Sequence, residues 1–80
     1  MNYQTLINKN IKKLRKKHNL AQEQFAEKIG ISLQGLSNIE RNKYQPTAST
    51  IDKVCQKFKI TPIELLAETS KENEIIIEKI

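Results

Sequence analysis

Side chains that perform catalysis are scarce in this chain of 80 residues. It has one histidine, His18, and one cysteine, Cys55, and neither has partners at the spacing of a zinc site or a nucleophile–base pair. A glycine loop that cradles phosphate is also missing, because the only glycines are Gly30 and Gly35. We therefore expect no enzyme activity, no metal and no cofactor. We interpret His18 as a helix C-terminal residue and Cys55 as an unreactive core thiol.

Basic residues are the more informative set. Lysine and arginine number 14 against nine acidic residues, a net charge of +5. Residues 1–67 hold twelve of the basic and five of the acidic residues, whereas residues 68–80 hold four glutamates and two lysines. A basic body indicates a polyanionic partner. The change in composition indicates two parts, a domain over residues 1–67 and a tail over residues 68–80.

The spacing of apolar residues predicts an all-α domain. Ile51, Val54, Cys55 and Phe58 recur at the period of one helix face, the clearest such pattern in the chain. Similar patterns predict five helices, over residues 5–18, 22–29, 32–41, 48–58 and from 61 onward.

The two central helices meet the demands of a helix–turn–helix unit. Such a unit lays its first helix across DNA phosphates and holds its second helix in the major groove. It needs a small residue where the helices cross, which Ala26 supplies, and a residue that accepts a left-handed turn, which Gly30 supplies. Apolar residues that lock the pair stand at Phe25, Ile29, Ile31, Leu36 and Ile39.

Residues 22–32 (QEQFAEKIGIS) and 36–41 (LSNIER) resemble the helix-turn-helix of the lambda-repressor/Cro-type family of bacterial and phage regulators. The likeness covers residues 6–66 and includes Thr61-Pro62-x-Glu64-Leu65 near its end. It implies a compact five-helix domain that binds operator DNA as a dimer.

The resemblance also implies roles for single residues. The residues that it places in the major groove are Leu33, Gln34, Ser37 and Asn38. Glutamine and asparagine amides pair with adenine, whereas a leucine contacts a thymine methyl. The residues that it places on phosphates are Gln22, Ser32, Arg41 and Lys43. Arg15 and Glu40 take the places of a structural ion pair, so we expect Glu40 not to contact DNA.

Three positions depart from the family pattern. Ala21 stands where a serine or threonine cap is usual, which costs about 1 kcal/mol. Asn42 replaces the usual glycine, and asparagine tolerates a left-handed backbone. Gly35 lies inside the second helix at a cost of about 1 kcal/mol. It either lets the backbone approach DNA closely or weakens base reading.

The tail over residues 68–80 carries the isoleucines Ile75, Ile76, Ile77 and Ile80. Three roles remain open for it: it holds a dimer together, it folds back on its own domain, or it begins a longer chain. If it captures another protein, the chain is an antitoxin or another protein-interaction module.

The sequence thus predicts a dimeric transcriptional repressor that reads a pseudo-palindromic operator through residues 32–41. A second hypothesis is the protein-interaction module, and a third is nonspecific binding to RNA or a membrane surface through the lysines of the first helix. The longest apolar run, Ile75–Ile77, is far shorter than the about 20 residues of a membrane span. We expect a cytoplasmic protein with double-stranded DNA as its partner and no small-molecule ligand.

Overall fold

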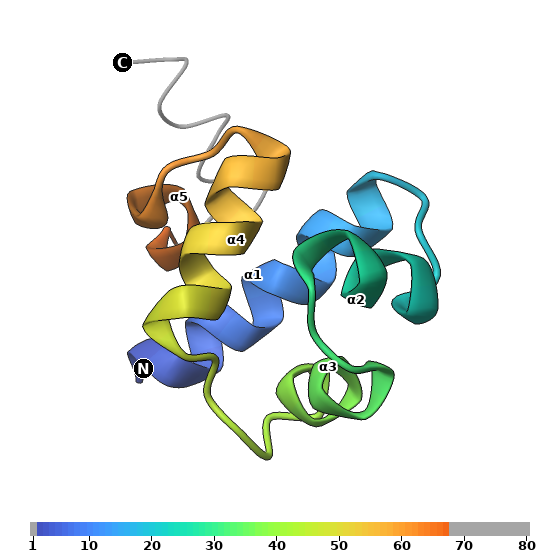
Figure 1. Ribbon diagram of the computed structural model, residues 1–80. Coiled ribbons are helices and arrows are strands. Elements are labelled where there is room, and N and C mark those ends of the chain that lie inside the picture. Colours follow the sequence, from blue (N-terminus) through green and yellow to red (C-terminus); the bar gives the residue numbers. More distant parts are fainter. Residues whose placement is uncertain (1, 68–80) are drawn as a thin grey trace.

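Five α-helices follow one another in a computed structural model that describes residues 2–67 (Figure 1). They are α1 (Tyr3–Lys17), α2 (Gln22–Ile29), α3 (Leu33–Glu40), α4 (Ala48–Phe58) and α5 (Pro62–Leu66). No strand occurs within residues 2–67, so the predicted all-α, five-helix fold is confirmed. The predicted tail lies outside the described residues, and so do the roles considered for its isoleucines.

The helix ends explain where each helix begins and stops. α1 begins at Tyr3, two residues earlier than expected, because the Asn2 side chain accepts a hydrogen bond of 3.0 Å from the Thr5 backbone N–H. α5 begins with the predicted combination of an N-cap threonine, Thr61, and a glutamate, Glu64, that binds back to it. Gly30 ends α2 with a φ of +73°, as its position after Ile29 predicts.

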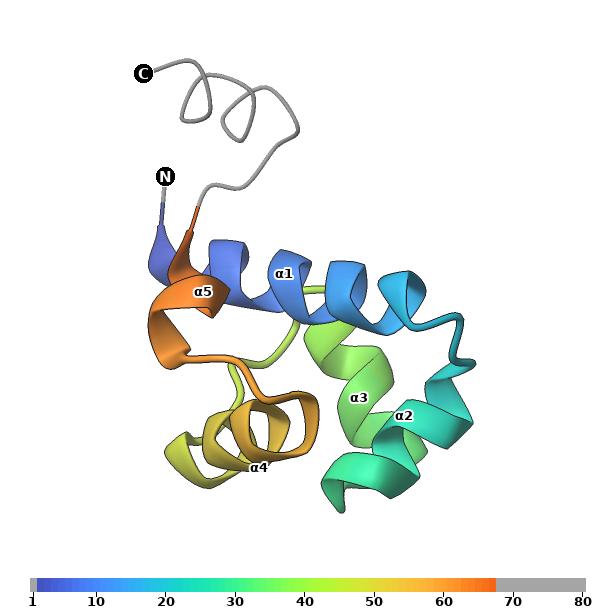
Figure 2. The same ribbon diagram turned by 90° about the horizontal axis from the view of Figure 1, so that it is seen from above.

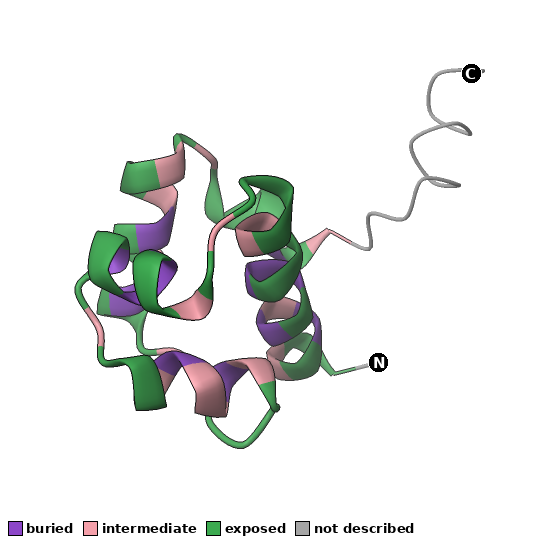
Figure 3. Ribbon diagram, turned by 90° about the vertical axis from the view of Figure 1, so that its right-hand side faces the viewer, coloured by how far each residue is buried: buried purple, intermediate pink, exposed green. Residues whose placement is uncertain are grey.

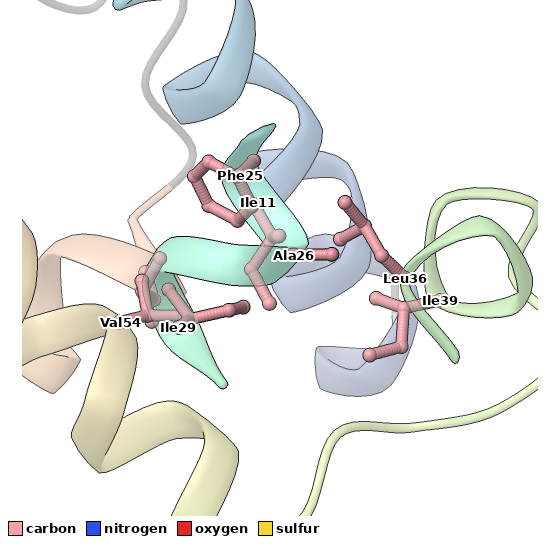
Figure 4. Packing of buried hydrophobic residues seen from close by; sticks show 8 residues of the cluster. Ile11, Phe25, Ala26, Ile29, Leu36, Ile39 and Val54 are labelled. Atoms are coloured by element: carbon pink, nitrogen blue, oxygen red, sulfur yellow. The ribbon is translucent and has the colours of Figure 1, made fainter. Parts of the chain in front are cut away.

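One apolar core joins all five helices. Its buried members are Ile11, Phe25, Ala26, Ile29, Leu36, Ile39, Val54 and Leu65. Figure 4 shows how Ile11 on α1 lies among the side chains from α2, α3 and α4. In Figure 3 the buried stretches face one another across the inside of the molecule, and exposed residues cover the outside. The helices therefore hold each other in place through side chains that no single helix could bury alone.

Aromatic rings and the lone thiol close the edge of this core. Phe58 stacks on Phe25 with ring centroids 5.0 Å apart. The His18 ring also contacts Phe58, with ring centroids 4.8 Å apart. Cys55 is half-buried against the core, and burial together with the carboxylates of Asp52 and Glu64 raises the pKa of its thiol. A raised pKa keeps the thiol protonated and slow to react.

Two buried asparagines tie α1 to distant parts of the chain. The Asn10 amide donates to the backbone carbonyls of Leu65 and Ala67, at 2.7 and 2.9 Å. These bonds fasten α5 to the first half of α1, where the two helices lie side by side in Figure 2. Asn8 is tied to the loop after α3 instead. Within residues 2–67, no helix is both long enough and apolar enough to cross a membrane.

Candidate nucleic-acid interface

The α2–turn–α3 unit presents one face of α3 to solvent and buries the other. Leu36 and Ile39 of α3 pack into the core against Phe25 and Ala26 of α2. Ser32 caps α3, because its hydroxyl accepts a hydrogen bond of 2.9 Å from the backbone N–H of Gly35. The buried face of α3 fixes which side chains face outward.

The four residues expected to read bases share the outer part of α3. Leu33 is 47% exposed and Gln34 is exposed, whereas Ser37 and Asn38 are half-buried. The Gln34 amide and the Arg41 guanidinium both donate to the Asn38 side-chain oxygen, at 3.2 and 3.3 Å. These distances lie at the long end for a hydrogen bond, and the groups face water. Base edges can therefore replace these contacts at little cost.

An ion pair stands behind α3 rather than on its outer face. Arg15 of α1 grips Glu40 with two parallel bonds, from Nε at 2.7 Å and from Nη2 at 2.9 Å. The third nitrogen of Arg15, Nη1, donates to the carbonyl of Leu20 at 2.8 Å. The side chain of Arg15 is only 13% exposed and that of Glu40 only 2%. The pair therefore joins the end of α3 to α1 and the α1–α2 loop, with the carboxylate sheltered from solvent.

The charge of Glu40 is held by its partners. Burial acts to raise the pKa of this carboxyl, but hydrogen bonds from Arg15 and Gln22 and the charges of Arg15 and Lys12 outweigh it, so the pKa lies below its usual value. In turn, the hydrogen bond to Glu40 raises the pKa of the Arg15 guanidinium against its own burial. Glu40 thus forms a sheltered ion pair with Arg15, at the position where the resemblance implied a structural one.

Gln22 begins α2, as expected of a residue that meets a phosphate. Its amide Nε2 donates to Glu40 Oε1 at 3.0 Å, so the ion pair orients it. An amide nitrogen carries two hydrogens, which leaves one for a second acceptor. The phosphate contact of Gln22 stays a prediction.

The loop after α3 carries the other expected phosphate ligands. Arg41 and Lys43 are exposed and flank Asn42, whose φ is +62°. The loop turns because the backbone N–H of Asn42 binds the Ile39 carbonyl at 2.9 Å and that of Lys43 binds the Asn38 carbonyl at 2.8 Å. Asn42 therefore fills the left-handed position that glycine usually takes.

The local structure explains why a glycine stands at position 35, inside α3. A Cβ built at this residue would lie 3.0 Å from the Ser32 hydroxyl, the oxygen that caps the same helix. The residue also lines a hollow of about 210 Å³ between α3 and the following loop, beside Ile31, Ile39 and Tyr44. Glycine at this position keeps room for the cap.

Sequence reasoning missed the two buried asparagines of α1. Asn8 and Asn10 are 1% and 7% exposed, and each uses its amide nitrogen for two long-range bonds. A usable signal was present, because asparagine is a poor helix former and two of them stand in the middle of a strongly periodic helix.

A second hollow lies where α1, α2 and α4 end. It measures about 370 Å³ and is lined by His18, Leu20, Lys28, Lys57, Phe58 and Lys59. These residues come from the C-terminal ends of α1, α2 and α4, and α4 ends at the opposite edge of Figure 1 from α3.

Comparison with known proteins places this geometry in context. A family model described as helix-turn-helix matches residues 11–65. A search of solved structures found no significant match.

Three curated relatives illustrate the similarity. Antitoxin PezA of Streptococcus pneumoniae is 39% identical over 88% of this chain, which spans 44% of that protein. The uncharacterized HTH-type transcriptional regulator y4dJ of Sinorhizobium fredii is 31% identical over 89% of this chain and 92% of its own length. The immunity repressor protein of Bacillus phage phi105 is 36% identical over 78% of this chain, which spans 43% of that repressor. None of these names is that of an enzyme.

Proposed function

We propose that this chain, which belongs to the lambda-repressor/Cro-type helix-turn-helix family, is a dimeric repressor that reads a pseudo-palindromic operator through α3. The observation that carries the proposal is the outer face of α3. It offers two exchangeable amides while Arg15 and Glu40 hold the helix from behind. The phage relative, named an immunity repressor, supports the same function.

Each side chain of this face has a distinct part in the proposal. Gln34 and Asn38 pair with adenine edges in the major groove, and Leu33 contacts a thymine methyl. Ser37 hydrogen-bonds a neighbouring base edge. The groups that hold the DNA backbone without reading sequence are Gln22, Ser32, Arg41 and Lys43.

A second copy of the chain accounts for exposed apolar side chains away from α3. Tyr3 of α1 is exposed, and so are Ile63 and Leu66 of α5. α5 packs beside the first half of α1, so both helices contribute to this side of the molecule (Figure 2). In the proposed dimer two copies of α3 enter successive major grooves about 34 Å apart. Occupation of a promoter by the dimer then blocks transcription sterically.

Selection of bound duplexes from a random DNA pool tests the proposal with the full chain. At about 0.15 M salt, weak nonspecific phosphate binding is suppressed. We expect enrichment of an inverted repeat whose half-sites lie one helical turn apart. Enrichment of no sequence, with binding that disappears as salt rises, would contradict the repressor.

Replacement of Gln34 and Asn38 by alanine tests the reading residues. We expect a loss of roughly 2–6 kcal/mol in discrimination between operator and random DNA. The matched control is Gln56→Ala, which removes an exposed glutamine from α4 and leaves α3 intact. Nonspecific binding through the lysines of α1 would be unchanged by either variant, so an unchanged double variant would favour that mode instead.

A second function is favoured by the similarity to Antitoxin PezA. In this case residues 68–80 bind a protein partner while the helical domain still binds DNA. Replacement of Ile76 and Ile80 by aspartate would then abolish partner binding and leave operator affinity intact. If the same isoleucines hold a repressor dimer, the variant instead elutes as a monomer in light-scattering chromatography and binds the operator weakly.

A further inference from the structure

We propose that Asn8 is a positioning residue for DNA binding, which fixes the loop of residues 41–46 on α1 so that Arg41 and Lys43 meet phosphates. The inference rests on the proposed function, because it assigns those two side chains to the DNA backbone. Asn8 itself is 1% exposed and cannot touch DNA, so it acts through the loop.

Both hydrogen bonds that the Asn8 side chain donates go to the loop, and its own oxygen is buried without a hydrogen-bond partner. Its amide Nδ2 donates to the side-chain oxygen of Asn42 at 2.8 Å and to the backbone carbonyl of Tyr44 at 2.9 Å. The Asn42 amide donates in turn to the Thr5 hydroxyl at 3.3 Å. Three hydrogen bonds thus cross from α1 to a loop more than thirty residues away in sequence.

Most of the loop is open to solvent. Residues 41–45 are exposed, and the Tyr44 ring does not enter the core. The backbone bonds of Asn42 and Lys43 reach only the end of α3, so they shape the turn but do not fix it against the domain. Asn42 also adopts a left-handed backbone, which asparagine tolerates better than most residues with a side chain. The bond from Asn8 to its side chain helps to hold it there.

Arg41 and Lys43 stand on either side of the fastened residue. A side chain held near its bound position loses less conformational entropy on binding. Without Asn8 the loop must be ordered by the DNA itself, and the phosphate contacts weaken on every sequence. Base reading depends on α3, which the Arg15–Glu40 pair holds independently.

Asn10 provides a matched control on the same helix. Asn8→Ala and Asn10→Ala each remove one buried asparagine and two hydrogen bonds from its amide nitrogen. Urea unfolding gives the stability of each variant, so that DNA binding is compared where both are folded. Asn10→Ala releases α5 and leaves the loop in place. If the two variants differ in DNA binding, the difference comes from the position of the loop and not from a general loss of stability.

The first readout needs no DNA. In Asn8→Ala the backbone N–H groups of Asn42 and Lys43 should exchange with solvent about tenfold faster or more than in the unaltered chain, because two bonds that hold the loop are gone. In Asn10→Ala these two groups should keep their protection. Asn42→Gly retains the left-handed turn but removes two of the three bonds and leaves only that from Asn8 to Tyr44. It should therefore also accelerate exchange, and it keeps the test valid if Asn8→Ala does not fold.

The second readout is the salt dependence of DNA binding by the full chain. The slope of log affinity against log salt should become shallower in Asn8→Ala, by about one for each phosphate that the loop no longer neutralises. Affinity should fall by a similar factor on operator and on random DNA, whereas Asn10→Ala keeps the slope of the unaltered chain. Unchanged amide exchange, or equal slopes for the two asparagine variants, would overturn the role of Asn8. Failure of the unaltered chain to bind any operator would overturn the proposed function instead, and the exchange experiment would still decide whether Asn8 holds the loop.

Discussion

The two ends of this domain distribute charge in opposite ways. α3 contains a single charged residue, Glu40, and that carboxylate is sheltered and engaged by Arg15. At the other end, three lysines and His18 surround the hollow where α1, α2 and α4 finish. The helix expected to read DNA is therefore nearly neutral, whereas lysines gather where α1, α2 and α4 end.

This difference separates specificity from general attraction to polyanions. A reading helix covered in lysine would bind any phosphate backbone, since such contacts carry no sequence information. Exposed charges more than about 8 Å from the DNA are largely screened at physiological salt. In the proposed complex, lysines such as Lys28 and Lys57 add only a long-range attraction that salt weakens, and the amides of α3 supply the sequence preference.

The largest expected effect contrasts one sheltered charge with one exposed charge. Arg15→Ala leaves Glu40 without its main partner, and we expect the free energy of unfolding to fall by about 3 kcal/mol. Lys57→Ala, at the basic end, should change it by less than about 0.5 kcal/mol. Urea unfolding followed by circular dichroism measures both. Equal losses in the free energy of unfolding would mean that the sheltered ion pair stabilises the domain no more than an exposed lysine does.

A titration tests the same contrast without mutation of Arg15. The pKa of Glu40 is held below its usual value in the folded protein, so its ionised form stabilises the fold above the pKa of the unfolded chain. That contribution should be lost as pH falls from about 4 through the lower, folded pKa. Urea unfolding at a series of pH values should show a smaller decline in Glu40→Gln than in the unaltered protein. Parallel curves would contradict this account of Glu40.

A double-mutant cycle at the start of α3 tests the role of Gly35. Gly35→Ala gains about 1 kcal/mol of helix propensity but crowds the Ser32 hydroxyl, so we expect almost no net change in stability. In a Ser32→Ala background the crowding is absent, and the same change should stabilise the protein by about 1 kcal/mol. Thermal unfolding measures all four proteins. Equal effects in both backgrounds would leave the glycine without this explanation.

A further expected effect is a small gain in stability. Ala21 stands at the N-cap of α2 with extended backbone angles and no side-chain hydrogen bond, while its own N–H is already bound by the Gln24 side chain at 2.9 Å. Ala21→Ser supplies the missing acceptor and should stabilise the domain by about 0.5–1 kcal/mol. Thr61→Ala at the capped start of α5 serves as the reverse comparison and should destabilise by a similar amount. No gain at Ala21 would show that the bond from Gln24 already suffices.

Much of the fold follows from local pattern in the sequence. The bounds of α2 and α4 are the predicted ones, because Gly30 terminates α2 and the apolar spacing of α4 is regular. The family model confirms the helix-turn-helix, whose packing and turn requirements are met by neighbouring residues such as Ala26 and Gly30.

The long-range polar contacts could not be predicted in the same way. Nothing in the residues around Asn8 and Asn10 tells which backbone carbonyls, more than thirty positions away, their amides will meet. The same holds for Lys59, which adopts a left-handed backbone with a φ of +55° at the end of α4. Base and phosphate contacts stay predictions, because they depend on a partner that no internal packing specifies.

The bonds from Asn10 make residues after α5 part of the packed domain. One bond ends on the carbonyl of Leu65, the last residue of the family match, and the other on that of Ala67, two residues beyond it. A fragment cut at residue 65 would leave the buried amide short of an acceptor, at a cost of about 1–3 kcal/mol. For protein engineering, Ala67 is therefore the earliest point at which a tag, a linker or another domain can be joined without loosening α1.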